Sequence, residues 1–258
     1  MILKALRRWR EQRAAQRRAI PESLWQLTLL RHPFLAERSA EDLAELRRLC
    51  SLFLSAKEFH GVNGFEVTDE VAVAVAAQAC LPVLRLGLSW YDGFVGIVMH
   101  EGEVVARRRV EDEDGIVHEY DEELAGEAME GGPLMLAWQS IAVSDDPAAF
   151  GADAVFNVVI HEFAHVIDMR DGLADGVPPL DSADRDRWID VIDAEWAHFR
   201  TRVDAGEDTL IDPYGAQAVE EFFAVAVEAF FVAPVAMRAQ EPVMYGLLAG
   251  FFKQDPAG

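Results

Sequence analysis

The chain contains an apolar stretch from Val155 to Ile167 that restricts how the protein around it can fold. Apart from four polar residues, every side chain in this stretch is apolar, which is typical of a helix buried on all sides. The four exceptions are Asn157, His161, Glu162 and His165. Polar groups inside such a helix are costly unless they are hydrogen-bonded or bind a metal. The sequence therefore predicts a core helix that carries functional polar side chains.

Three of these polar residues form an HExxH pattern, in which His161 and His165 are four residues apart. Residues at i and i+4 lie one above the other on a helix, so both imidazoles can reach a single Zn²⁺. Glu162 lies beside them, where it can take a proton from a zinc-bound water. Histidines satisfied by core hydrogen bonds are the alternative, but the apolar surroundings favour metal binding. The motif predicts a zinc site with Glu162 as general base.

Catalytic zinc sites use three protein ligands and keep a fourth position open, so a third ligand is needed. The stretch Ala218–Phe231 predicts a second apolar helix, and it carries three carboxylates. Glu221 and Glu228 are seven residues apart and share one face, whereas Glu220 points about 100° away from Glu221. We interpret Glu221 as the third ligand and Glu228 either as a partner of a histidine or as a half-exposed salt-bridge residue. Glu220 is the main alternative ligand, and His198 is a weaker one.

Tyr214 lies in an Asp-Pro-Tyr segment, seven residues before Glu221. A phenol hydroxyl at this place can donate a hydrogen bond to the oxyanion that forms when water attacks a peptide carbonyl. Spacing alone supports this role weakly, because most tyrosines near a core helix simply pack against their neighbours. We keep Tyr214 as a candidate catalytic residue.

Three stretches surround the candidate residues: Ile160–Asp168, Asp212–Tyr214 and Glu221–Val225. Together with shorter motifs along most of the chain from about residue 20, they resemble the Mlc titration factor A family of bacterial zinc metallopeptidases. Two of those motifs are Cys80-Leu81-Pro82-Val83-Leu84 and Trp90-Tyr91-Asp92-Gly93-Phe94. The basic N-terminal segment cannot be matched to the family pattern, so the resemblance leaves its role open.

The resemblance implies a gluzincin-type site, related to the catalytic domain of anthrax lethal factor. On that pattern Glu162 is the general base and Tyr214 assists at the transition state, while zinc is bound by His161, His165 and Glu221. The resemblance also implies an aminopeptidase-like activity on short peptides and binding to the glucose-responsive transcriptional repressor Mlc.

The overall composition disfavours a protein that binds nucleic acid or spans a membrane. The 258 residues carry a formal net charge of −22, which opposes direct contact with nucleic acid. The apolar run Val71–Ala77 is far shorter than the about 20 residues that cross a bilayer. Cys50 and Cys80 lie in apolar contexts and are expected to be free, buried thiols, so nothing indicates an oxidising compartment. We expect a cytoplasmic protein.

Residues 1–20 form a basic N-terminal arm with seven basic residues and one acidic residue. No apolar core follows it, so it does not resemble a signal peptide. It is interpreted as a solvated arm, and the alternative is an arm that lies against the acidic body or touches a membrane surface. Residues 21–258 are expected to form a single zincin-like metallopeptidase domain. The predicted fold class is α+β, mostly helical, with a small β-sheet beside the HExxH helix.

The sheet is expected from residues 90–141, where short apolar and Val-rich segments alternate with turns. Phe94–His100 and Glu103–Val110 predict a β-hairpin, Glu119–Glu130 an acidic loop, and Leu134–Ile141 a short strand. That last strand either pairs an extended substrate by edge addition or lies in the core. Elsewhere, Ser39 and Thr68 are typical residues for the start of a helix.

The predicted function is zinc-dependent hydrolysis of short peptides by a metal-activated water. The alternative is a regulatory protein that sequesters a transcription factor and uses zinc only structurally. The number of protein ligands distinguishes the two: three ligands with Glu162 beside an open position favour catalysis, whereas a fourth, such as His198 or Glu228, favours a structural site.

Overall fold

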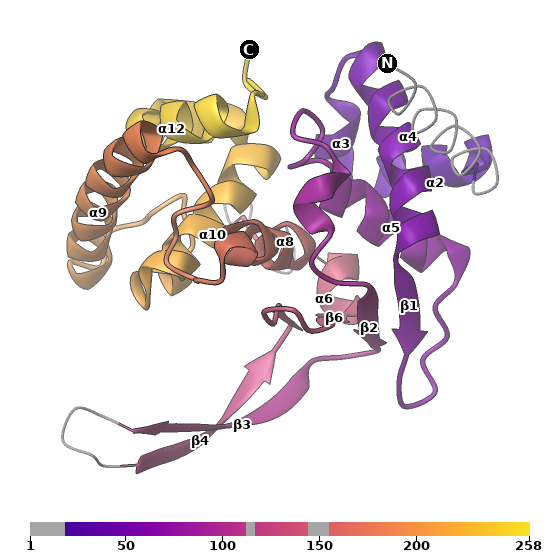
Figure 1. Cartoon of the computed structure of the whole chain (residues 1–258), viewed down its shortest axis with the longest axis horizontal. Coiled ribbons are helices and arrows are strands. Elements are labelled where there is room, and N and C mark those ends of the chain that lie inside the picture. The colour runs from indigo at the N-terminus through magenta and orange to yellow at the C-terminus, as the bar shows by residue number, and fades with distance from the viewer. Residues whose placement is uncertain (1–18, 112–116, 144–154) are drawn as a thin grey trace.

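The HExxH stretch forms helix α8, Val158–Asp168, which lies between an N-terminal and a C-terminal group of helices (Figure 1). The structure, a computed structural model, describes residues 19–111, 117–143 and 155–258, without the side chains of residues 106–111 and 117–123. The predicted basic arm lies outside the described residues except for Ala19 and Ile20, and Ile20 is buried in the core. The arm therefore stays a prediction.

The N-terminal group consists of helices α2, Glu22–Arg31, α3, Pro33–Ala36, α4, Ala40–Ala56, and α5, Asp69–Cys80. The predicted caps are confirmed for two of them. The Ser39 hydroxyl accepts a hydrogen bond from the Asp42 amide at the start of α4, and the Thr68 hydroxyl accepts one from the Val71 amide at the start of α5. Capping satisfies backbone donors that a helix start otherwise leaves unpaired.

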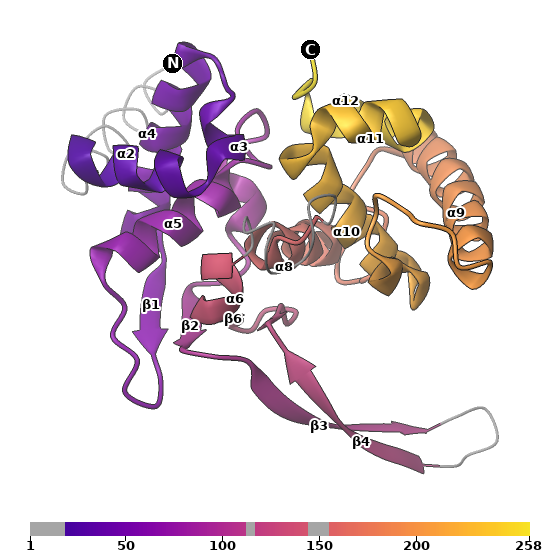
Figure 2. The same cartoon turned by 180° about the vertical axis from the view of Figure 1, so that it is seen from behind.

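The C-terminal group consists of helices α9, Ser182–Asp204, α10, Val219–Val232, α11, Pro234–Gln240, and α12, Pro242–Phe252. Short 3₁₀ turns occur at η1, Leu88–Tyr91, η2, Met169–Asp171, and η3, Pro213–Ala216. Helix α10 packs directly on α8, so the second apolar helix lies beside the first as its composition predicts. Helix α5 contacts α8 from the N-terminal group, as the reverse view also shows (Figure 2).

A four-stranded mixed sheet lies next to α8. Its order is β1, Glu58–Gly61, β2, Gly96–His100, β6, Leu134–Ala137, and β5, Gly126–Glu127. The first three strands are parallel, with Ile97 opposite Phe59 on one side and opposite Leu134 on the other. Strand β5 runs antiparallel to β6 and forms the edge of the sheet, where it contacts α8. The predicted α+β class, mostly helical with a small sheet beside the HExxH helix, is confirmed.

The predicted hairpin between Phe94–His100 and Glu103–Val110 is wrong. Strand β2 pairs in parallel with β1 and β6, and its alternate residues Ile97 and Met99 are fully buried. Strand β3, Val104–Glu111, instead pairs antiparallel with β4, Val117–Leu124, in a separate ribbon that projects away from the helices (Figures 1 and 2). The register runs from Val104 opposite Leu124 to Glu111 opposite Val117. The second segment of the predicted hairpin therefore pairs with a later part of the chain.

Two further expectations for this region need correction. The acidic segment Glu119–Glu130 is not a loop, because it contributes to β4 and forms β5. The strand predicted at Leu134–Ile141 ends at Ala137, since helix α6, Trp138–Val143, begins directly after it. This strand, β6, has a partner on each side, so the core position is confirmed and edge addition to β6 is excluded.

The buried apolar residues form one connected cluster that runs from Ile20 to Phe252. Phe163, inside the HExxH pattern, packs against three other aromatic rings in this cluster. Its ring centroid is 4.8 Å from that of Tyr91, 5.7 Å from Phe53 and 6.0 Å from Phe94. These contacts join α8 to α4 and to the segment around η1. Packed aromatic rings therefore hold α8 against the N-terminal part of the protein.

The two cysteines are free and fully buried, as the sequence predicts. Cys50 lies on α4 and Cys80 ends α5. Among the described residues, no helix is both long enough and apolar enough to cross a membrane.

Replacing Phe163 with Ala is expected to lower the free energy of unfolding by about 3–5 kcal/mol, because it removes buried area and leaves a cavity between α8, α4 and the segment around η1. Urea unfolding of the metal-free protein measures this loss. Leu30→Ala is the matched control, since the Leu30 side chain is 77% exposed and its truncation should change stability by less than about 0.5 kcal/mol. Similar losses for the two variants would contradict this account of the core.

Candidate metal centre

Asn157 sets the start of the helix that carries the HExxH residues. Its side-chain oxygen accepts a hydrogen bond from the Ile160 amide at 2.9 Å, so α8 begins at Val158 although the apolar run begins earlier. The i, i+4 spacing then places His161 one turn before His165, with their rings edge to face and their centroids 4.8 Å apart. Both rings turn their Nε2 atoms toward one point, and these atoms are 3.1 Å apart.

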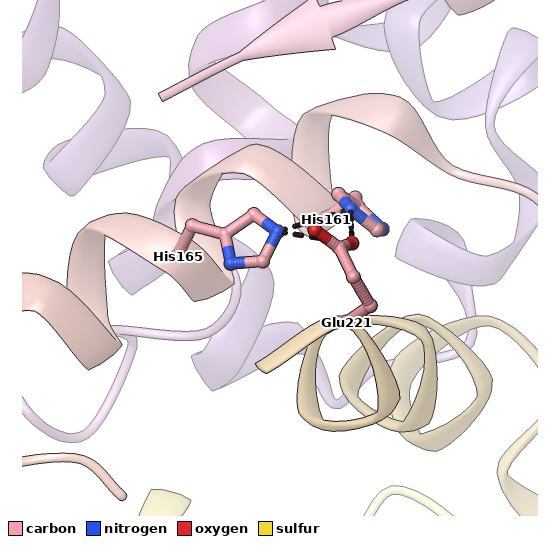
Figure 3. A group of neighbouring side chains, drawn as sticks. All are labelled: His161, His165 and Glu221. Carbon is pink, nitrogen blue, oxygen red and sulfur yellow. Dashed lines mark hydrogen bonds and ion pairs between the residues drawn. The ribbon is translucent and has the colours of Figure 1, made fainter. Parts of the chain in front are cut away.

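The third member of the site comes from α10. Glu221 Oε2 lies 3.1 Å from His161 Nε2 and 3.4 Å from His165 Nε2, and all three side chains are partly buried (Figure 3). Among the described residues, these three form the one group of His, Cys, Asp and Glu side chains that converges closely enough to hold a metal ion. Neither Glu220 nor the exposed His198 belongs to it.

The donor atoms match the requirements of a tetrahedral metal ion. Ligand atoms at about 2.0–2.1 Å from a tetrahedral zinc are separated from one another by about 3.3 Å. The three separations at this site, 3.1, 3.1 and 3.4 Å, form a nearly equilateral triangle of that size. Two imidazoles and one carboxylate are also ligands that zinc commonly takes. The residues present therefore fit such an ion.

The charges around the site also favour a cation. Burial by itself would lower the pKa of His161, but its hydrogen bonds to Glu221 and Glu228 outweigh that effect and raise the pKa well above its ordinary value. Burial would raise the pKa of Glu221, but hydrogen bonds from His161 and His165 lower it well below its ordinary value. The carboxylates thus stabilise positive charge at the point where the three side chains meet, and a metal ion would compete there with a proton.

Glu162 follows His161 on α8 and is only 5% exposed. Burial raises the pKa of Glu162, although His161 and His165 oppose the rise, and the Ala128 amide donates a hydrogen bond to its carboxylate. The backbone of strand β5 passes directly over this side chain, since a Cβ atom built on Gly126 would lie 2.5 Å from Glu162 Cγ. Glycine at residue 126 is therefore required for this close approach.

A cavity of about 350 Å³ opens beside the site. Its lining includes Gly126, His161, Glu162, Asp212 and Tyr214. Tyr214 lies in η3, where the Asp212 side chain accepts a hydrogen bond from its amide at 2.8 Å. The Tyr214 side chain is 39% exposed, and its ring centroid is 6.1 Å from that of His161. The structure thus brings the predicted Tyr214 to the same cavity as Glu162.

Glu228 lies beside His161, as one of the two interpretations of its position on α10 predicted. Its side chain is 2% exposed, so the alternative of a half-exposed salt-bridge residue is wrong. Glu228 Oε1 lies 2.8 Å from His161 Nδ1, on the opposite side of the ring from Glu221. Burial raises the pKa of the Glu228 carboxyl, and its hydrogen bonds to His161 and Asn157 oppose that rise.

Sequence reasoning missed the role of strand β5. An isolated glycine between Ala125 and Glu127 is a signal of close backbone approach, but the acidic residues around it favoured a solvated loop. It also did not predict that Gln78, on α5, accepts a hydrogen bond from Asn157 at the start of α8. Only the folded chain brings these residues to the HExxH helix.

Asp168 ends α8 three residues after His165 and is fully buried. Its Oδ2 atom accepts a hydrogen bond from the Gly176 amide at 2.9 Å, whereas its Oδ1 atom has no hydrogen-bond partner among the described residues. Burial raises the pKa of Asp168 to about 7, from an ordinary value of 3.8. This residue ties the end of the HExxH helix to the loop before α9.

A helix with an HExxH pattern and a carboxylate donated by a later helix is the arrangement of a metallopeptidase. The comparison with known sequences agrees: this chain belongs to the glucose-regulated metallo-peptidase M90 family, whose pattern matches residues 6–253. The match includes most of the basic N-terminal segment, so the expectation that this segment does not fit the family pattern is wrong. The chain is 36% identical over 251 residues to the uncharacterized protein slr2042 of Synechocystis sp., covering 96% of this chain and 89% of that protein. It is 32% identical over 228 residues to Mlc titration factor A of Salmonella gallinarum, covering 87% and 84% respectively.

The raised pKa of Asp168 predicts a pH-dependent loss of stability. Between about pH 4 and about pH 7 the folded state holds a proton on Asp168 that the unfolded state has released, so the free energy of unfolding falls as the pH rises through this window. Asp168→Asn removes this contribution. The stability of the variant relative to wild type should therefore rise by about 2–4 kcal/mol between the two ends of the window.

Urea unfolding of the metal-free wild type and Asp168→Asn at several pH values measures that difference. Other titrating groups act equally on both proteins and cancel in the comparison. A stability gap that stays constant from acidic to neutral pH would show that Asp168 does not titrate abnormally.

Proposed function

We propose that this protein is a zinc-dependent peptidase that cleaves short peptides, in an aminopeptidase-like manner. The observation that carries the proposal is the triangle of His161, His165 and Glu221 donors with the buried Glu162 beside it. Three protein donors leave one position of a tetrahedral ion for water or substrate, as in catalytic zinc sites. Glu228 contacts the far nitrogen of His161, so it does not act as a fourth ligand.

The chain's own residues supply the proton chemistry. Zinc, when bound, polarises the peptide carbonyl and acidifies the attacking water. Glu162 is the general base, which takes a proton from the water and passes it to the leaving amine. Burial raises the pKa of Glu162, which makes its carboxylate a better proton acceptor than an exposed one. Tyr214 donates a hydrogen bond from its hydroxyl to the oxyanion that forms on the carbonyl oxygen.

The substrate is proposed to lie along β5 as an added strand. One edge of β5 pairs with β6, and within the described part of the chain no strand pairs with its other edge. The backbone at Gly126 touches Glu162, so a peptide on the open edge brings its own backbone beside the base. The 350 Å³ cavity lies toward one end of β5, and a second cavity, of about 590 Å³ and lined by Ala128, Met129 and Val166, lies toward the other.

A regulatory role alongside hydrolysis is suggested by the relatives. A protein named Mlc titration factor A is 32% identical in sequence over 87% of this chain, and the family's name calls it glucose-regulated. We propose binding to an Mlc-like repressor as a second activity, in a cytoplasmic protein whose residues 21–258 act as one catalytic domain. The alternative, a repressor-binding protein with a purely structural zinc ion, is disfavoured by the three-donor site and by the placement of Glu162 and Tyr214 in one cavity.

The Glu162→Gln variant tests the proposed base. It should retain zinc, because Glu162 is not among the three donors, and its turnover of aminoacyl and short-peptide chromogenic substrates should fall by about 100-fold or more. Zinc content after dialysis and initial rates on the same preparation measure both effects. Glu221→Gln is the contrasting variant and should lose zinc. Full turnover by Glu162→Gln would refute its role, and no turnover by zinc-loaded wild type on any substrate would favour the regulatory alternative.

The Tyr214→Phe variant tests the oxyanion donor. Removing only the hydroxyl should lower kcat by about 100-fold with little change in KM, because the hydrogen bond forms in the transition state. Steady-state kinetics on the best chromogenic substrate gives both constants. A change confined to KM would instead assign Tyr214 to substrate binding.

A further inference from the structure

Glu228 holds His161 from the side that faces away from the proposed metal. Its two carboxylate oxygens serve different partners: Oε1 contacts His161 Nδ1 at 2.8 Å, and Oε2 accepts a hydrogen bond from the Asn157 amide. When His161 binds a metal through Nε2, its Nδ1 atom carries the proton and must donate. Both partners of Glu228 are then donors, and a carboxylate is the group that can accept from both.

Asn157 connects this carboxylate to two helices. Its side chain is fully buried and uses both of its ends: the oxygen accepts from the Ile160 amide at 2.9 Å, and the Nδ2 atom donates to Gln78 Oε1 at 2.7 Å. Its backbone amide is the donor to Glu228. A shift of Asn157 would therefore displace both the oxygen that caps α8 and the amide that donates to Glu228.

Gln78 fixes the other end of the chain of hydrogen bonds. It lies on α5, is fully buried, and its Nε2 atom donates to the Ala74 carbonyl at 3.2 Å on the same helix. This bond orients the amide, so that its oxygen faces Asn157. A continuous set of buried hydrogen bonds thus runs from α5 through Asn157 and Glu228 to His161.

From this geometry we propose that Gln78 and Asn157 are positioning residues that orient His161 for metal binding through Glu228. The inference rests on the proposed metal centre and adds to it a dependence of zinc affinity on helix α5, a part of the N-terminal group that contributes no ligand. Apolar residues pack around this set of hydrogen bonds, and Gln78 Nε2 also lies 3.5 Å from Nε2 of the buried His32. An unpaired polar group in these surroundings costs free energy, so the loss of one member is expected to displace the others.

The test measures zinc affinity rather than hydrolysis. The dissociation constant is obtained by competition with a chromogenic zinc chelator, and the absorption spectrum of the Co²⁺-substituted protein reports the ligand geometry. Glu228→Gln should bind zinc about 10- to 100-fold more weakly, because an amide offers one acceptor to two donors. Gln78→Met, which keeps the side-chain length, should weaken binding by about three- to tenfold and alter the Co²⁺ spectrum.

Asn157→Ser is the second variant, in case Gln78→Met does not fold. Serine keeps a capping oxygen for α8 but cannot reach Gln78, so it separates the link from the cap. We expect the same three- to tenfold weakening. The double variant Gln78→Met/Glu228→Gln should bind zinc no more weakly than Glu228→Gln alone, because both changes act through one contact to His161.

Tyr91→Phe is the matched control. It also removes a buried hydrogen bond to α5, from the Tyr91 hydroxyl to the Ala79 carbonyl at 2.8 Å. It leaves the hydrogen bonds that connect Gln78, Asn157, Glu228 and His161 intact. It should lower the urea midpoint but keep the wild-type zinc affinity and Co²⁺ spectrum. Folded Gln78→Met or Asn157→Ser protein with both wild-type properties would overturn the inference. Wild-type protein that binds no zinc would overturn the proposed function itself, and the inference with it.

Discussion

The structure depends on the burial of polar side chains in an apolar helix. Helix α8 is surrounded by packed aliphatic and aromatic groups, so its polar residues are buried or largely shielded from water. Each must find a partner on a neighbouring element, because an unpaired polar group in such surroundings costs free energy. His161 and His165 find Glu221, while Asn157 finds Gln78 and its own helix. The need for partners determines which helices lie beside α8 and in which register.

This requirement also explains the chemistry of the site. Helix α10 brings carboxylates to both sides of the His161 ring, which makes the meeting point of the three side chains favourable for positive charge. The edge strand β5 covers Glu162, and a glycine allows its backbone to approach. Glu162, the proposed base, is therefore buried, with a raised pKa, yet it borders a cavity that Tyr214 also lines. Glu162 is thus shielded from bulk water by the protein and still reachable from the cavity.

The candidate site was largely predictable because its residues carry local signals. The HExxH spacing on an apolar helix and two carboxylates seven residues apart on another are periodic patterns, and helical geometry converts them into faces. The ambiguity between Glu220 and Glu221 needed the structure, since it depends on how α10 is rotated against α8. The β region was less predictable. The segments after Trp90 predicted strands, but strand pairing joins residues far apart in the sequence, and the predicted hairpin was wrong.

The sequence by itself determined helices α8 and α10, the residue types of the proposed metal ligands and the family, because these follow from periodicity and short motifs. Only the tertiary structure decided which strand forms the edge beside Glu162, and that Gln78 on α5 reaches Asn157. The reason is physical: a hydrogen bond between side chains about 80 residues apart has no local signature. Its partners become neighbours only when the apolar faces of α5, α8 and α10 pack together.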